Sequence, residues 1–187
     1  MLGQFFVQGW APDPLLWAQH DPWLVLLSVL VSTGASTVAM HMAQLARQAQ
    51  STQGKNLALA SGALALGSGV WTMHYVGMLA FAVCGQGRFD PWVTSLSVLP
   101  SIFASWVALR VLMRPVLSAP LLWAAAVLMG AGIGTMHYVG MAASALAPFM
   151  RYGLGGFVLS LVVAVVLAAL ALWVRFGLQR FLPLGSW

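Results

Sequence analysis

Two identical seven-residue segments carry the side chains in this sequence that are best suited to bind a metal ion. Residues 72–78 and 135–141 both read Thr-Met-His-Tyr-Val-Gly-Met, 63 residues apart, and each lies inside a long apolar run. An ionisable side chain in such a run is a functional candidate, because it is costly to hold in a membrane unless it faces a cavity or a partner. Imidazole together with thioether suits copper, and methionine favours Cu(I).

The two copies supply the predicted ligands. Residues four apart share one face of a helix, so each histidine lies beside the methionine that ends its motif, and the preceding methionine flanks the same cleft. The predicted ligands from both copies are Met73, His74 and Met78, with Met136, His137 and Met141. We expect Tyr75 and Tyr138 to hydrogen-bond a bound ligand or to orient a histidine. The alternative is that both histidines only pack between helices, although the residues before each motif have diverged, Ser-Gly-Val-Trp against Ala-Gly-Ile-Gly.

Two further histidines lie outside the motifs. His20 precedes Asp21-Pro22-Trp23, and Phe89 occupies the corresponding position before the second Asp-Pro-Trp, so a histidine is not needed to start the helix. We predict His20 as a third nitrogen ligand, with an exposed interfacial histidine as the alternative. His41 lies toward the other end of its helix, and we expect it at the interface and not in the metal site.

The composition identifies an integral membrane protein. Hydrophobic residues make up 61% of the 187 residues and charged residues only 6%, against roughly a quarter charged in a soluble domain. The net charge of +5 comes from scattered basic residues, which argues against nucleic acid as a partner. A single cysteine, Cys84, excludes an intrachain disulfide and a zinc ribbon. No nucleophile with a base, phosphate loop or carboxylate pair is evident, so we expect no enzyme.

Five segments reach the length of about 20 apolar residues that a membrane-crossing helix needs. They are Trp23–Ala46, Leu57–Val83, Trp92–Met113, Leu121–Ala147 and Leu154–Phe176, preceded by an interfacial segment over residues 1–22. Short links predict a single all-α domain over residues 1–187, an antiparallel bundle in the lipid bilayer. Most basic residues fall at one end of the helices and the acids at the other. By the positive-inside rule the N-terminus lies outside and the C-terminus in the cytoplasm.

The helices follow a tandem two-helix repeat. The first and third spans share Asp-Pro-Trp, Leu-Ser-Val-Leu and Ala-Ser-x-Val-Ala; the second and fourth share the motif, and the fifth is a weaker copy of the first. A third motif helix is therefore expected after the fifth span, where the sequence instead ends with Arg-Phe-Leu-Pro-Leu-Gly-Ser-Trp. Glycines before the motifs are expected to let helix backbones pack closely: Gly67, Gly69, Gly130, Gly132 and Gly134. The bilayer midplane is taken midway between the basic residues that flank each motif helix, Lys55 and Arg88 or Arg114 and Arg151. A rise of about 1.5 Å per residue then puts His74 about 4 Å and His137 about 7 Å outside the midplane.

With both Met-His-Tyr-x-Gly-Met motifs and the Asp-Pro-Trp helix start, the chain resembles the MHYT domain of bacterial membrane proteins over nearly its whole length, with Val76 and Val139 in place of the threonine. The resemblance implies a multi-pass protein of the bacterial cytoplasmic membrane that binds copper through the Met, His and Tyr residues of both motifs, with His20 matching a histidine common before the first span. It also implies sensing of oxygen, CO, NO or redox state, relayed to a cytoplasmic signalling domain or partner protein, and it leaves room for a homo-oligomer. The sequence departs from the family pattern in two respects, since it shows neither a third motif nor an output domain.

Two other functions stay open at this point. A haem-binding electron-transfer protein would use His74 and His137 as axial ligands. A copper-handling permease would use the methionines and histidines as a path, although the shortage of intramembrane charge and of broken helices argues against a coupled transporter.

Overall fold

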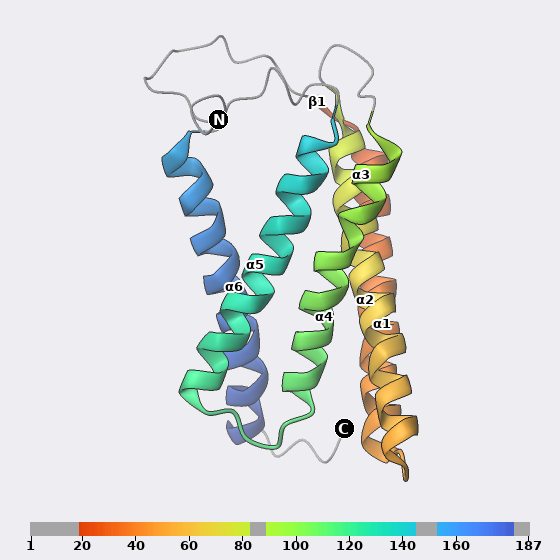
Figure 1. Ribbon diagram of the computed structural model, residues 1–187, viewed down its shortest axis with the longest axis vertical. Helices are drawn as coiled ribbons and strands as arrows, with labels where there is room; N and C mark the ends of the chain where they lie inside the picture. The colour runs from red at the N-terminus through yellow and green to blue at the C-terminus, as the bar shows by residue number, and fades with distance from the viewer. Residues whose placement is uncertain (1–18, 83–88, 145–152, 182–187) are drawn as a thin grey trace.

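The computed structural model describes residues 19–82, 89–144 and 153–181, which are almost entirely helical (Figure 1). In chain order the elements are β1 (Gln19–His20), α1 (Pro22–Gln48), α2 (Thr52–Ala80), β2 (Phe81–Ala82), α3 (Pro91–Leu96), α4 (Val98–Leu112), α5 (Ala119–Ala142) and α6 (Leu154–Phe181). The predicted helical class is confirmed, with helix at each of the five predicted spans. The second and fourth spans end earlier than predicted, at Ala80 and Ala142.

Among the residues that the structure describes, four helical segments are long and apolar enough to cross a membrane: Pro22–Gln48, Pro91–Leu112, Ala119–Ala142 and Leu154–Gly177. The chain is therefore a multi-pass membrane protein. α2 is not among the four, because it carries the polar and small residues of the first motif and of the stretch before it. It nevertheless packs between α1 and α4 and runs beside them at the same height (Figure 1).

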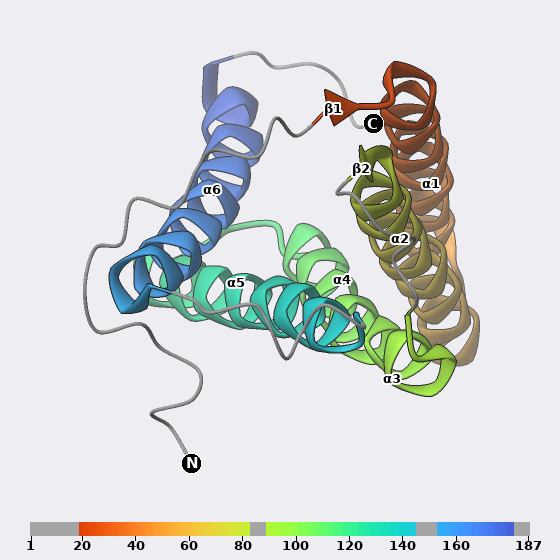
Figure 2. The same ribbon diagram turned by 90° about the horizontal axis from the view of Figure 1, so that it is seen from above.

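The long helices alternate in direction and pack in sequence order, α1 on α2, α2 on α4, α4 on α5 and α5 on α6. Seen from above, they form an open arc with α1 at one end and α6 at the other (Figure 2). The predicted antiparallel bundle is thus an arc over the described residues. The first motif lies on α2 and the second on α5, with α4 packed against both helices.

The two Asp-Pro-Trp segments begin helices in the same way. The carboxylate of Asp21 accepts the amides of Trp23 and Leu24 at 2.8 and 3.3 Å, and that of Asp90 accepts the amides of Trp92 and Val93 at 2.9 and 3.0 Å. Proline suits the first helical position, because the backbone N–H that it lacks would have no partner within the helix there. The backbone N–H of each aspartate also donates to the end of a motif helix, Asp21 to the Ala80 carbonyl at 2.9 Å and Asp90 to the Ala143 carbonyl at 2.8 Å.

We expect Asp90→Ala to lower the free energy of unfolding by about 1 kcal/mol, the usual cost of a lost N-cap. Asp90→Asn should keep most of the stability, because an amide oxygen caps equally well. Thermal denaturation of the purified variants in detergent measures the difference. Equal stability of the alanine and asparagine variants would show that the capping bonds contribute nothing.

The third span is not the single helix that was predicted over residues 92–113. It is divided at Ser97 into α3 and α4, which together still form one membrane-capable segment. Pro100 explains the break, because its ring nitrogen cannot donate to the carbonyl of Leu96 one turn earlier. At the break, the Ser97 hydroxyl donates to the Thr94 carbonyl at 2.6 Å.

All five predicted packing glycines lie where a side chain would collide with a neighbouring helix. A Cβ on Gly67 would lie 2.5 Å from the Ile102 Cα of α4, and one on Gly130 would lie 2.9 Å from the Val165 backbone nitrogen of α6. A Cβ on Gly69, Gly132 or Gly134 would lie 2.1, 2.8 or 2.4 Å from the nearest atom of another helix. Each motif helix therefore approaches its neighbours at distances that only glycine allows.

Candidate metal centre

The two motif histidines meet at the place where α2 and α5 approach each other. His137 Nδ1 and His74 Nε2 lie 2.9 Å apart, and the ring centroids are 4.7 Å apart with the rings inclined by 64°. Both side chains are partly buried. Residues 63 positions apart in the sequence thus face each other, as expected if both motifs contribute to one site.

The short contact between the histidines constrains their protonation. A hydrogen bond between two imidazoles needs one ring nitrogen to donate its proton and the other to present a lone pair. Two imidazolium rings would point N–H groups at each other, so at least one ring is neutral. A neutral imidazole nitrogen is a ligand for copper, zinc, iron and nickel, and the crossing of α2 and α5 therefore presents nitrogen donors.

The pair lies near one end of both motif helices. His74 is six residues before the end of α2 at Ala80, and His137 five residues before the end of α5 at Ala142, or about 9 and 8 Å along the axes. The midpoints of the two helices are about 12 and 10 Å away by the same rise. The predicted distances of about 4 and 7 Å from the bilayer midplane stay predictions, because the midpoint of a helix does not mark the middle of a membrane.

Met78 is the motif methionine that reaches across the crossing. It lies one turn beyond His74, and a Cβ added to Gly140 of α5 would lie 3.6 Å from the Met78 methyl carbon and 4.0 Å from Ser97 Oγ. Met136 is only 2% exposed, whereas Met73 and Met141 are partly buried. The end of the Met78 side chain thus lies against α5 at Gly140, three residues after His137.

The two motif tyrosines have different neighbours although their motifs are identical. The Tyr75 ring stacks on Trp71 at 5.6 Å between centroids and meets the edge of Phe89 at 5.3 Å. Tyr138 has its ring 4.9 Å from that of His137, and its hydroxyl lies 2.6 Å from Ser160 Oγ of α6. Tyr138 therefore connects the histidine pair to α6, while Tyr75 packs toward the start of α3.

Sequence reasoning missed a set of polar contacts that joins α2 to the third span. Trp71 donates its indole N–H to Ser97 Oγ at 2.8 Å and to the Thr94 carbonyl at 3.1 Å, and Ser101 donates its hydroxyl to the Gly67 carbonyl at 2.8 Å. The signal was present, since the serine of Leu-Ser-Val-Leu recurs in the first and third spans. These bonds hold α2 in place three residues before His74.

The structure does not bring the other two histidines into this pair. His20 is exposed and pairs with Phe81 in the short ladder between β1 and β2. His41 is exposed on α1 toward the opposite end. Within residues 19–82, 89–144 and 153–181, no three His, Cys, Asp or Glu side chains are grouped to hold a metal ion. The role of His20 stays a prediction, and Cys84 lies outside the described residues.

Comparison with known proteins relates this chain to bacterial signalling proteins. The bifunctional diguanylate cyclase/cyclic di-GMP phosphodiesterase MucR of Pseudomonas aeruginosa is 36% identical over 166 residues, 89% of this chain and 24% of MucR. The cyclic di-GMP phosphodiesterase NbdA of the same organism is 36% identical over 153 residues, 82% of this chain and 19% of NbdA. The signalling protein YkoW of Bacillus subtilis is 29% identical over 124 residues, 66% of this chain and 15% of YkoW.

The chain thus spans about a quarter or less of the length of these relatives. No solved structure matches it. The family model of the MHYT repeat, described as a bacterial signalling protein N-terminal repeat, matches twice, over residues 67–125 and 130–184. Each match contains one copy of the histidine motif and the helix that follows it. The chain belongs to the MHYT family of bacterial signalling proteins.

Proposed function

We propose that this chain is a membrane sensory domain that holds copper between α2 and α5. The observation that carries the proposal is the 2.9 Å contact between His74 and His137, which joins the two motif copies in one place. His74 and His137 supply imidazole nitrogens, and Met78 brings a thioether to the same crossing. Nitrogen and thioether donors without a carboxylate fit copper and do not fit calcium or magnesium, which prefer oxygen.

Bound copper would supply a redox-active centre that can take up a diatomic gas such as oxygen, CO or NO. The residues of the chain provide the ligands and a route away from them. His137 packs against Tyr138, whose hydroxyl meets Ser160 and whose ring lies 4.6 Å from Phe157, both on α6. A change at the histidine pair therefore reaches α6 through direct contacts.

The proposed orientation places the site toward the outside and the signal output in the cytoplasm of a bacterial cell. Asp21 and Asp90 lie at the end of the helices near the histidine pair, and the opposite end carries the basic residues Arg47, Lys55, Arg110, Arg114 and Arg175. Basic residues mark the cytoplasmic side. The printed names of MucR and NbdA refer to cyclic di-GMP turnover, and we propose that α6 relays the state of the metal site to an output of this kind.

Elemental analysis together with an absorption spectrum of the purified protein tests the copper site. We expect about one copper per chain after loading, no Soret band, and loss of the metal in the double variant His74→Ala/His137→Ala. A well-folded wild-type protein that takes up no copper would contradict the proposal. The matched control is His41→Ala, which removes an exposed imidazole from the far end of α1 and should leave the metal content unchanged.

The same absorption spectrum distinguishes a copper site from the alternative, a haem site. For a porphyrin, the two ring nitrogens, which lie 2.9 Å apart in hydrogen-bond contact, would have to separate and take opposite faces of the macrocycle as axial ligands. A Soret band that disappears in the double variant would show that the bound cofactor is haem and not copper. Copper movement into liposomes that contain the protein would instead favour a permease.

A further inference from the structure

α4 exposes a single stripe of side chains. Its exposed residues are Leu99, Phe103, Trp106 and Arg110, which lie three or four positions apart and therefore share one side of the helix. The rest of α4 packs against α2 and α5, and Leu109, next to Arg110, is only 1% exposed. We call the four exposed residues the α4 stripe.

The α4 stripe is apolar along most of its length and charged at one end. Leu99, Phe103 and Trp106 are 58, 48 and 39% exposed, and the Phe103 and Trp106 rings stack with their centroids 6.4 Å apart. Arg110 follows in the last turn of α4. From Leu99 to Arg110 the stripe covers about 16 Å, close to half of a bilayer core of about 30 Å. The stripe therefore has the length of one lipid leaflet.

Trp106 positions the charged end of the stripe. The guanidinium carbon of Arg110 lies over the Trp106 ring, 4.9 Å from its centroid, which is within the reach of a cation–π interaction. A guanidinium in such a contact still has N–H groups that can donate to a phosphate in bidentate geometry. Because the arginine is already held in place, less side-chain freedom is lost when an anion binds.

The described part of the chain offers no carboxylate near Arg110. Its two acidic residues, Asp21 and Asp90, begin helices at the other end of the bundle, and Asp90 lies about 30 Å from Arg110 along the third span. Arg114, four residues after Arg110, adds a second exposed positive charge. The complement of this end of the stripe is therefore an anion from outside the chain.

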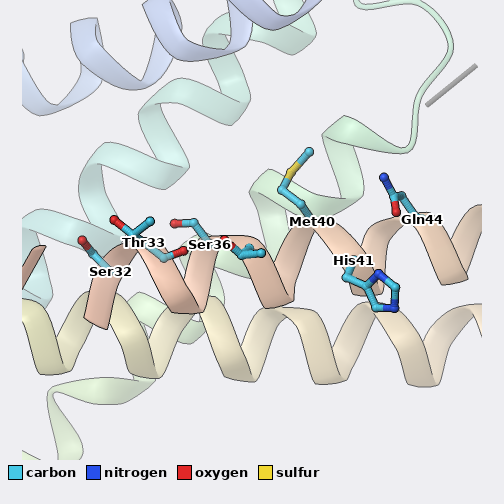
Figure 3. A pocket seen from close by; sticks show the side chains of 7 residues that line it. Ser32, Thr33, Ser36, Met40, His41 and Gln44 are labelled. Carbon is cyan, nitrogen blue, oxygen red and sulfur yellow. Dashed lines mark hydrogen bonds between the residues drawn. The ribbon is translucent and has the colours of Figure 1, made fainter. Parts of the chain in front are cut away.

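The corresponding face of α1 lacks these features. The two Asp-Pro-Trp segments are 69 residues apart, so Trp106 and Arg110 correspond to Thr37 and His41 of α1. The residues that line the pocket beside His41 include no Phe, Trp or Tyr (Figure 3). An aromatic stripe that ends in a positioned cation is therefore particular to α4 and is not a general property of the repeat.

We propose that the α4 stripe binds an anionic phospholipid, with the headgroup phosphate at Arg110 and one acyl chain along the apolar residues of the stripe. Basic residues at a membrane surface attract anionic lipids, and the apolar length of the stripe favours a lipid over free phosphate, which would use only the charged end. The site is separate from the histidine pair and does not depend on a bound metal.

Native mass spectrometry of the purified protein tests the proposal. The detergent contains phosphatidylglycerol and phosphatidylcholine in equal amounts and with identical acyl chains, so that the two lipids differ in headgroup charge. We expect the wild type to retain phosphatidylglycerol preferentially, and Arg110→Gln to lower this preference about fivefold, the effect of one basic residue at an anionic surface. The matched control is Arg47→Gln, which removes an exposed arginine at the same end of the bundle and should leave the preference unchanged.

Two further arms test the aromatic contact and the source of the phosphate. Trp106→Leu keeps an apolar side chain and the net charge, and it should lower the preference about threefold because the cation–π contact is lost. Excess inorganic phosphate should leave the bound lipid in place.

The proposal is overturned by a wild type without preference, by an unchanged preference in Arg110→Gln, or by an equal loss in Arg47→Gln. Wild-type preference in Trp106→Leu would contradict the positioning of Arg110 by its ring. Displacement of the lipid by inorganic phosphate would show that the stripe binds an anion and not a lipid.

Discussion

His74→Ala and His137→Ala, each made alone, are expected to lower the affinity for Cu(I) more than about 100-fold. Loss of an outer-shell partner of a metal ligand already costs 10- to 100-fold, and each of these variants removes a proposed ligand. The two losses should be similar, because each ring supplies one of the two nitrogens at the crossing. Competition against a Cu(I) chelator of known affinity measures the change in the purified protein.

His20→Ala is the informative companion to the two single variants. A loss comparable to that of His74→Ala would show that His20 joins the metal site once copper is bound, and an unchanged affinity would exclude His20 as a ligand. His41→Ala controls for general loss of imidazole. Wild-type affinity in both His74→Ala and His137→Ala would mean that the paired histidines only pack, which was the alternative for this motif.

Gly67→Ala is expected to lower the free energy of unfolding by about 3 kcal/mol, at the upper end of the cost of overpacking. A Cβ at this position would lie 2.5 Å from Cα and 2.7 Å from the backbone nitrogen of Ile102, and neither atom can move without shifting α4. The shift would also strain the hydrogen bond from Ser101 to the Gly67 carbonyl. Thermal or SDS-induced unfolding in detergent measures the change.

Gly77→Ala is the matched control, since it lies on the same helix and inside the motif. A Cβ there would meet nothing within 4 Å, and alanine is favoured over glycine in a helix by about 1 kcal/mol. We therefore expect Gly77→Ala to be neutral or slightly stabilising. If Gly67→Ala were equally well tolerated, the close contact between α2 and α4 would not be needed for stability.

Much of the helical layout could be predicted because apolar length alone defines a membrane-capable segment. The meeting of His74 and His137 could be anticipated because two copies of one motif occupy equivalent helices of a repeat. The helix ends could not be predicted, because hydropathy does not show that the carbonyls of Ala80 and Ala143 accept the amides of Asp21 and Asp90. These tertiary bonds mark where the motif helices stop, six residues after His74 and five residues after His137.

The neighbours of the two motif tyrosines could not be predicted from the motif sequence either. Tyr75 stacks on Trp71, whereas the position corresponding to Trp71 in the second copy is Gly134, which leaves space for Leu161 of α6. Tyr138 instead bonds to Ser160. The two tyrosines thus have different partners although their motifs are identical, because the residues that contact them have diverged between the repeats.

The position of the histidine contact gives the arc a mechanical property. α2 and α5 converge near their outer ends and separate toward the basic end, where α4 lies between them (Figure 1). From His74 back to the start of α2 at Thr52 there are 22 residues, or about 33 Å. A rigid tilt of α2 about the close contact of Gly67 with Ile102 of α4, seven residues from His74 and 15 from Thr52, would therefore move the far end about twice as far as the histidine end.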